Sequence, residues 1–182
     1  MTQFEFVQVT VAIILGLGIS DILRGLGEQF RNRGRIEVAW LQIAASCLLL
    51  LVILIYLWNF WLASEVTWTL PLFMTQIASA VALALSAQFI KVDLSSTKTL
   101  EAQYFDNCTA TYLVWAGGPL FGVFFSMATG NASAADAGRV GAAFLLTSLG
   151  LIKNRTYHKA VLIVLLLLAT AGSPILGLFQ LR

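Results

Sequence analysis

The sequence predicts an all-α, polytopic membrane protein: one bundle of six transmembrane helices with both termini outside. Three observations predict this class. The 182 residues are 59% hydrophobic and 11% charged, whereas soluble domains carry about 25% charged residues. The apolar runs are continuous rather than alternating, and they approach the roughly 20 residues that a helix needs to cross the hydrocarbon core. The basic residues fall almost entirely on one side.

The six predicted spans cover residues 4–26, 38–62, 68–90, 109–129, 132–152 and 160–181. We expect helices because backbone polar groups in lipid must be satisfied within the segment or in a closed barrel. The connections are short, so residues 1–182 form a single integral membrane domain. The first span lacks the basic leader of a signal peptide, and we expect it to remain as an anchor.

The basic residues predict the orientation. Nine of the eleven Lys and Arg residues lie in the first, third and fifth connections. The positive-inside rule makes these connections cytoplasmic and places the chain in the cell inner membrane. They would also meet anionic lipid at the cytoplasmic face, and the net charge of +2 does not indicate a nucleic-acid surface. The nine are Arg24, Arg31, Arg33, Arg35, Lys91, Lys98, Lys153, Arg155 and Lys159.

The first span carries small residues along its second half. Gly16 and Ser20 form a small-xxx-small step, which favours close helix contact. Asp21 precedes Arg24 by three residues, so we expect the two to pair near the cytoplasmic interface. Helix packing or oligomerisation is one role for this surface, and an ion site at Asp21 is the other. The packing residues are Gly16, Gly18, Ser20 and Gly25.

The second and third spans carry aromatic rings where they meet the outer interface, the position that amphipathic rings prefer. In the third span, Gln76, Ser79 and Ser86 lie close to one helical stripe. Such a stripe either lines an aqueous path or makes hydrogen bonds between helices. The aromatic residues are Tyr56, Trp58, Phe60, Trp61 and Trp68.

A near-repeat links the fourth and sixth spans. Proline removes a helix donor and adjacent glycine lets the backbone open, so two interrupted helices would expose carbonyls at the midplane, where transporters bind. The alternative is packing, because Gly and Pro are common in transmembrane helices. Both motifs point the same way, which argues against an inverted repeat. The expected pathway residues are Gly117, Gly118 and Pro119 in Ala116–Gly122, and Gly172, Ser173 and Pro174 in Ala171–Gly177.

The fifth span is short of apolar residues. Residues 140–152 offer 13 uncharged positions, about 20 Å of helix, so a crossing must include Asp136 and Arg139. At spacing i, i+3 these two can pair, and an ionisable pair within a span is a functional hypothesis. Alternatively, Arg139 snorkels to the headgroups and Asp136 caps the helix. A re-entrant segment would invert the later topology, but the three basic residues that follow argue against it.

Part of the chain resembles a known group of proteins. The pattern is Phe4, Leu15-Gly16-Leu17-Gly18, Leu23-Arg24-Gly25-Leu26, Arg31-Asn32-Arg33 and Trp40, followed by Leu100, Tyr104 and Phe105. In these features the chain resembles an uncharacterised group of small bacterial multi-span inner-membrane proteins of unknown function. Cys108 and Thr109 stand where that pattern would have an Arg pair. The resemblance covers about a third of the chain and implies a membrane location without an activity.

No catalytic or cofactor motif is recognisable. The sequence lacks a helical His pair for haem, a Gly-rich phosphate loop, an HExxH motif and a Gly-x-Ser-x-Gly elbow. Cys47, Cys108 and the single His158 give no metal-binding spacing. His158 falls in a basic connection, where we expect it to be solvated. We therefore predict that the protein is not an enzyme and uses no metal or cofactor.

Two functions remain. The leading hypothesis is a small transporter or channel subunit for an ion or small solute, working as a homo-oligomer. The midplane breaks would form its pathway, Asp136 and Arg139 its outer gate or coupling pair, and Asp21 a weaker site at the inner side. The alternative is an accessory or scaffolding membrane protein that binds partner helices through the face from Gly16 to Gly27.

Overall fold

The computed structural model describes residues 2–32, 39–61, 67–91, 99–130 and 134–171. All regular structure within these ranges is α-helical. Four of the described helices are long and apolar enough to cross a membrane: α1, residues 40–60 of α2, α3 and α4. The described parts of α5 and α6 are shorter, at 18 and 17 residues. The helices are α1 (Gln3–Arg31), α2 (Trp40–Trp61), α3 (Leu70–Phe89), α4 (Leu100–Ala128), α5 (Ala134–Leu151) and α6 (Arg155–Ala171).

Capping residues set the starts of α1 and α4. The Thr2 hydroxyl accepts a hydrogen bond from the Glu5 backbone N–H, and the Glu5 carboxylate accepts one from the Thr2 N–H, which forms a capping box. Thr99 caps α4 by accepting from the Ala102 N–H. Because of this cap, α4 begins at Leu100, well before the start that hydropathy predicts.

The prediction of a basic loop before the sixth span is wrong. The side-chain oxygen of Asn154 accepts hydrogen bonds from the backbone N–H groups of Thr156 and Tyr157, as an N-cap residue does. α6 therefore begins at Arg155, and only residues 152–154 separate it from α5. His158 consequently lies in the first turns of a helix.

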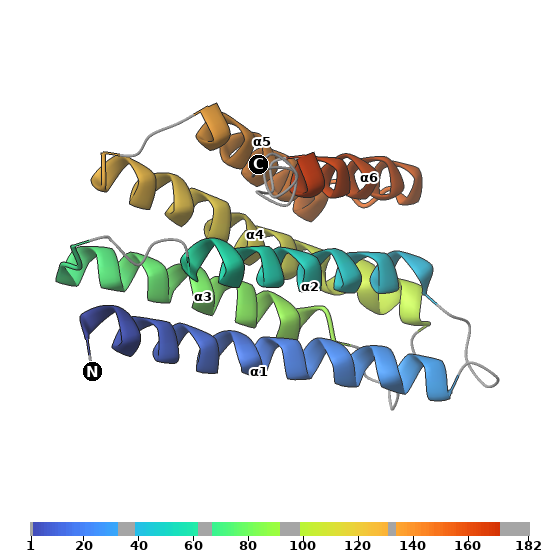
Figure 1. The fold of residues 1–182 in the computed structure, drawn as a ribbon. Coiled ribbons are helices and arrows are strands. Elements are labelled where there is room, and N and C mark those ends of the chain that lie inside the picture. Colours follow the sequence, from blue (N-terminus) through green and yellow to red (C-terminus); the bar gives the residue numbers. More distant parts are fainter. Residues whose placement is uncertain (1, 33–38, 62–66, 92–98, 131–133, 172–182) are drawn as a thin grey trace, which may run out of the picture.

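The six helices form a closed ring. α1, α3, α4 and α5 make a row in which each helix packs on the next, with α1 at one edge in Figure 1 and α5 toward the other. α2 packs on α1, α6 packs on α5, and α2 and α6 contact each other. α2 also touches α3 and α4. The ring therefore has a row of four helices on one side and the pair α2 and α6 on the other.

Contacts define two ends of this bundle. At the end where α1 begins, here called the N-terminal end, four rings with centroids 5.7–6.4 Å apart join α1, α2, α4 and the residues before α3. At the opposite end, the Gln42 amide donates to the Ile90 carbonyl and Glu101 pairs with Arg155. Successive helices therefore run between the same two ends. The four rings are Phe4, Phe60, Trp68 and Phe125.

The small-residue surface of α1 is divided between two faces. A Cβ atom on Gly18 would lie 3.1 Å from the Cα and 3.4 Å from the Cβ of Ala84, so α1 and α3 approach closely there. Gly25 is also buried, although nothing lies within 4 Å of a Cβ built on it. Gly16 and Ser20 are exposed. Gly18 thus serves packing inside the chain, while Gly16 and Ser20 stay on the surface.

Candidate binding cavity

A cavity of about 1250 Å³ lies inside the ring, in the half nearer the N-terminal end. α2 and α6 line it on one side, and α3, α4 and α5 line it on the other. Its volume exceeds the roughly 300–1,000 Å³ of most small-molecule sites. Leu48, Val52 and Trp115 contribute to its apolar wall. The cavity is therefore large enough for a ligand and mostly apolar.

Polar groups enter this apolar lining at a few points. The Tyr56 hydroxyl of α2 donates to the side-chain oxygen of Gln76 on α3, and it lies 3.2 Å from the Gln76 backbone carbonyl. Asn59 and Ser126 also line the cavity. A few convergent polar groups in an apolar wall are typical of sites that orient a ligand.

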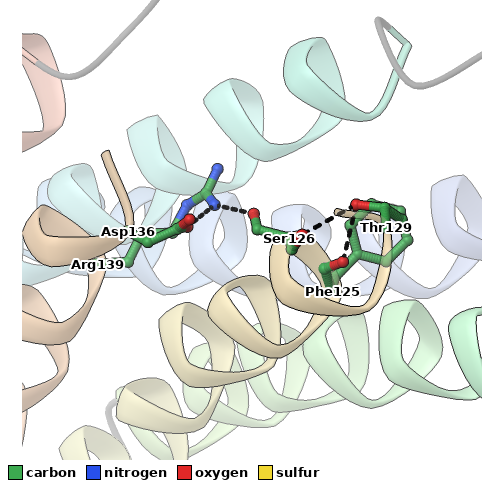
Figure 2. Close-up of polar contacts among 5 residues, drawn as sticks. All are labelled: Phe125, Ser126, Thr129, Asp136 and Arg139. Carbon is green, nitrogen blue, oxygen red and sulfur yellow. Dashed lines mark hydrogen bonds and ion pairs between the residues drawn. The ribbon is translucent and has the colours of Figure 1, made fainter. Parts of the chain in front are cut away.

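The charged pair of α5 lies on the wall of the cavity beside the end of α4 (Figure 2). Arg139 Nη1 donates to the Asp136 carboxylate and, over 2.6 Å, to the Ser126 hydroxyl. Thr129 donates to the Phe125 and Ser126 carbonyls in the last turn of α4. The Asp136 side chain is 12% exposed, whereas that of Arg139 is 40% exposed. The structure thus forms the pair that the i, i+3 spacing allows, and part of the guanidinium remains accessible.

The Gly-Pro step of α4 lines the same cavity through Gly118, Pro119 and Gly122. The predicted interruption is not found, because α4 continues as a helix through Pro119. Ser79 of α3 donates to the Gly118 carbonyl over 3.3 Å, a hydrogen bond that joins α3 to α4 beside the proline. A Cβ on Gly122 would lie 3.6 Å from Arg139 Cδ, so the arginine stem rests on this glycine.

The predicted polar stripe of α3 is used for hydrogen bonding. Gln76 bonds to α2 and Ser79 to α4, whereas Ser86 donates to the Ala82 carbonyl of its own helix. All three side chains are buried, and only Gln76 of the three lines the cavity. Two of the three side chains therefore join α3 to its neighbours, and one of these two also lines the cavity.

The other predicted pathway residues lie elsewhere. Gly117 packs near Ala82 of α3 and does not line the cavity. Asp21 is half-buried on α1, also outside the lining. In the described part of the chain it forms no ion pair with Arg24, which is exposed. Three predicted residues lie outside the described ranges: Gly172, Ser173 and Pro174.

The opposite end of the bundle holds a buried histidine, so the prediction that His158 is solvated is wrong. His158 is 0% exposed. Its Nδ1 lies 2.7 Å from the Tyr104 hydroxyl, which lies 2.7 Å from the Tyr112 hydroxyl. Its Nε2 lies 2.8 Å from the Ile152 carbonyl oxygen. Phe105 packs edge-on against the imidazole with centroids 5.2 Å apart. These contacts join α6 to α4.

The Ile152 carbonyl determines where the hydrogens lie in the hydrogen-bond chain formed by His158, Tyr104 and Tyr112. A carbonyl oxygen only accepts, so His158 Nε2 carries a hydrogen. In the neutral ring Nδ1 then accepts from the Tyr104 hydroxyl, whose oxygen accepts in turn from Tyr112. Burial lowers the pKa of His158, which favours this neutral form.

Within the described residues, no group of three or more His, Cys, Asp or Glu side chains could hold a metal ion. Comparison of the chain with protein-family models, curated proteins and solved structures found no match.

Proposed function

We propose that the chain is a six-span inner-membrane protein with both termini outside, and that it forms a small transporter or channel subunit. The observation that carries this proposal is the cavity of about 1250 Å³ between α2, α6 and the row of α3, α4 and α5. A scaffold alone needs no such space, because bundle interiors are otherwise packed to near-crystalline density. The cavity would be the solute-binding chamber.

The distribution of charge supports this orientation. The described basic residues at the opposite end of the bundle include Arg24, Lys91 and Lys153, whereas Arg139 lies at the N-terminal end. By the positive-inside rule the cavity then opens in the outer half of the membrane. The four helices that can cross a membrane supply the framework, and α5 and α6 would complete six spans.

The lining favours a small solute with an apolar body and a hydrogen-bond-accepting head. Apolar walls would bury the body. Arg139 uses Nη1 for Asp136 and Ser126, while its other guanidinium N–H groups have no partner among the described residues. Because Asp136 balances the charge of Arg139, a neutral acceptor would fit as well as an anion.

Flux from proteoliposomes of the purified protein tests the proposal. Flux is measured under K⁺ and proton gradients in turn, and then with short-chain carboxylic acids. The wild type should conduct at least one of these, and Asp136→Asn should abolish that flux because it leaves Arg139 without its counter-charge. Conduction that is indifferent to Asp136→Asn would remove the charged pair from the pathway.

A matched pair of glycines tests whether the cavity is the chamber. Gly138 and Gly141 both lie on α5, and nothing lies within 4 Å of a Cβ built on either one. Only Gly138 lines the cavity. Gly138→Trp should therefore block flux by filling the space, and Gly141→Trp should not. Equal flux in both variants would contradict the assignment of the cavity.

A scaffolding role is the second candidate, because α1 leaves an apolar face with a small-residue step exposed. Ile13 and Leu17 are 61% and 64% exposed and lie near the exposed Gly16 and Ser20. Under this alternative, Ser20→Leu should break a complex in cross-linking experiments in bilayers, and Val9→Leu should serve as an exposed control on the same helix. Asp136→Asn would leave assembly intact. Absence of flux under every gradient would favour this role.

A further inference from the structure

A continuous buried hydrogen-bond chain lies at the end of the bundle opposite the cavity. Tyr112, Tyr104 and His158 are 0%, 4% and 0% exposed, and both of their mutual contacts measure 2.7 Å. The proposed binding chamber does not require this chain. Burying a titratable group linked to two hydroxyls nevertheless costs free energy, which a functional role would explain.

A buried glutamine at the same end has a side-chain oxygen without a hydrogen-bond partner. Gln42 of α2 is 2% exposed; its amide nitrogen donates to the Ile90 carbonyl, but its side-chain oxygen accepts no hydrogen bond in the described structure. A buried acceptor that receives no hydrogen bond costs free energy and calls for an explanation. Gln42, Tyr104 and Tyr112 all line one small cavity of about 10 Å³. That volume is close to the minimum that holds a single water molecule.

We propose that His158 is a proton-binding site, and that Tyr104, Tyr112, one internal water and Gln42 form the relay that accommodates its charged form. In the neutral state the hydroxyl hydrogens point toward the histidine: Tyr112 donates to Tyr104, which donates to Nδ1. This direction follows from the hydrogen on Nε2. The oxygen of Gln42 is then not needed as an acceptor.

Protonation reverses the direction of the whole chain. The added proton binds His158 Nδ1, which becomes a donor to the Tyr104 oxygen. Tyr104 then rotates its hydrogen to the Tyr112 oxygen, and Tyr112 rotates its hydrogen to the water that donates to Gln42 Oε1. Every hydroxyl keeps one hydrogen, so the net change is one proton gained at the imidazole. The unpartnered oxygen of Gln42 is therefore the acceptor that the charged state requires.

The surroundings leave the imidazolium few other partners. In the described structure no carboxylate contacts His158, and Glu101 of the facing helix is engaged with Arg155 at 3.5 Å. Without the relay, the hydrogen on Nδ1 of a charged His158 and the hydroxyl hydrogen of Tyr104 would point at each other, because the Tyr104 hydroxyl would have no other acceptor. The titratable or charged groups on the elements around His158 also include Asp106 and Cys108 of α4, Tyr157 and Lys159 of α6, and Lys153 in the connection, and Arg24 of α1 and Lys91 after α3 lie at the same end of the bundle.

The relay also touches the floor of the large cavity. The ring of Tyr112 stacks on Trp115 with centroids 5.9 Å apart and an interplanar angle of 13°, and Trp115 lines the cavity. Tyr112 therefore packs on a ring that a bound solute would contact. The proton site itself does not depend on solute transport.

Nitrogen NMR on protein labelled only at histidine tests the proposal directly, because the chain contains a single His. At neutral pH the wild type in nanodiscs should show the neutral tautomer with hydrogen on Nε2. Gln42→Leu should lower the measured pKa of His158 by about one pH unit, although Gln42 makes no contact with the ring, because one hydrogen bond of the charged state is lost. Gln76→Leu, a buried glutamine at the other end, should leave it unchanged.

Tyr112→Phe gives an independent second test, since it removes one hydroxyl while keeping the ring, and it should lower the same pKa. It remains informative if Gln42→Leu does not fold. A histidine titration unchanged in both variants, or a neutral tautomer with its hydrogen on Nδ1, would overturn the relay.

Discussion

The contact between α1 and α3 permits a quantitative prediction at Gly18. Replacing Gly18 with Ala adds a methyl group 3.1 Å from a backbone atom of Ala84, which cannot move alone. The neighbouring helix must shift, and overpacking of this kind costs about 1–3 kcal/mol. Gly16, two residues earlier on the same helix, has nothing within 4 Å of an added Cβ.

The matched pair separates packing from helix propensity. Glycine to alanine in a helix interior gains up to about 1 kcal/mol of intrinsic propensity at either position. Gly16→Ala should therefore be neutral to stabilising, while Gly18→Ala should lose all of that gain and be destabilised by up to about 2 kcal/mol. The difference between the two variants does not contain the helix propensity, because both make the same substitution. Their free energies of unfolding should therefore differ by about 1–3 kcal/mol, the cost of overpacking.

Reversible unfolding in mixed SDS micelles, followed by far-UV circular dichroism, measures this difference. Both variants should keep the helical content of the wild type. If Gly18→Ala proves as stable as Gly16→Ala, the close approach of α1 and α3 at Ala84 is not present in the folded protein, and the row of helices must be assembled differently.

Three further predictions concern the opposite end and the α4–α5 contact. Because burial lowers the pKa of His158, the unfolded chain binds more protons, so stability should fall as pH drops below about 6.5; His158→Gln, which keeps a donor and an acceptor, should flatten this dependence in thermal denaturation. Thr109→Val removes a 2.7 Å hydrogen bond to the Gly150 carbonyl and should cost about 1 kcal/mol in unfolding experiments; no loss would show that α4 and α5 are not joined there. Glu101→Gln should change stability by less than about 0.5 kcal/mol, since its ion pair with Arg155 is exposed, and a larger loss would reveal a partner beyond that arginine.

Hydropathy located the described helices, but two of them, α4 and α6, begin before the spans that it predicts. Glu101 and Asp106 lower the apolar average at the beginning of α4, yet they lie on exposed or half-buried positions while Tyr104 is buried on the other face. A window average cannot separate two faces of one helix. The local signal was present in Thr99, a preferred N-cap residue. Counting caps as well as apolar residues would have found it.

The site was predictable only in part, for a similar reason. The pairing of Asp136 with Arg139 is local, so the i, i+3 spacing indicated it. His158 and Tyr104 are 54 residues apart, and no periodicity links them. Reading Asn154 as a cap would have moved His158 from a loop into a helix, but its burial depends on how α6 packs against α4 and α5. The cavity likewise arises from the packing of five helices.

α4 connects the two features, and its proline lies between them. On the N-terminal side of Pro119 in the sequence, Tyr112 belongs to the buried histidine chain and stacks on Trp115; on the C-terminal side, Gly122 supports Arg139 at the cavity. Proline removes the N–H that would bond to the Trp115 carbonyl, so α4 bends most easily at this point. If movement between its halves couples the two ends, Pro119→Ala should stiffen α4, raise the free energy of unfolding by up to about 3 kcal/mol, and reduce any flux. Raised stability with unchanged flux would show that the helix moves as one rigid rod and that the proline serves packing alone.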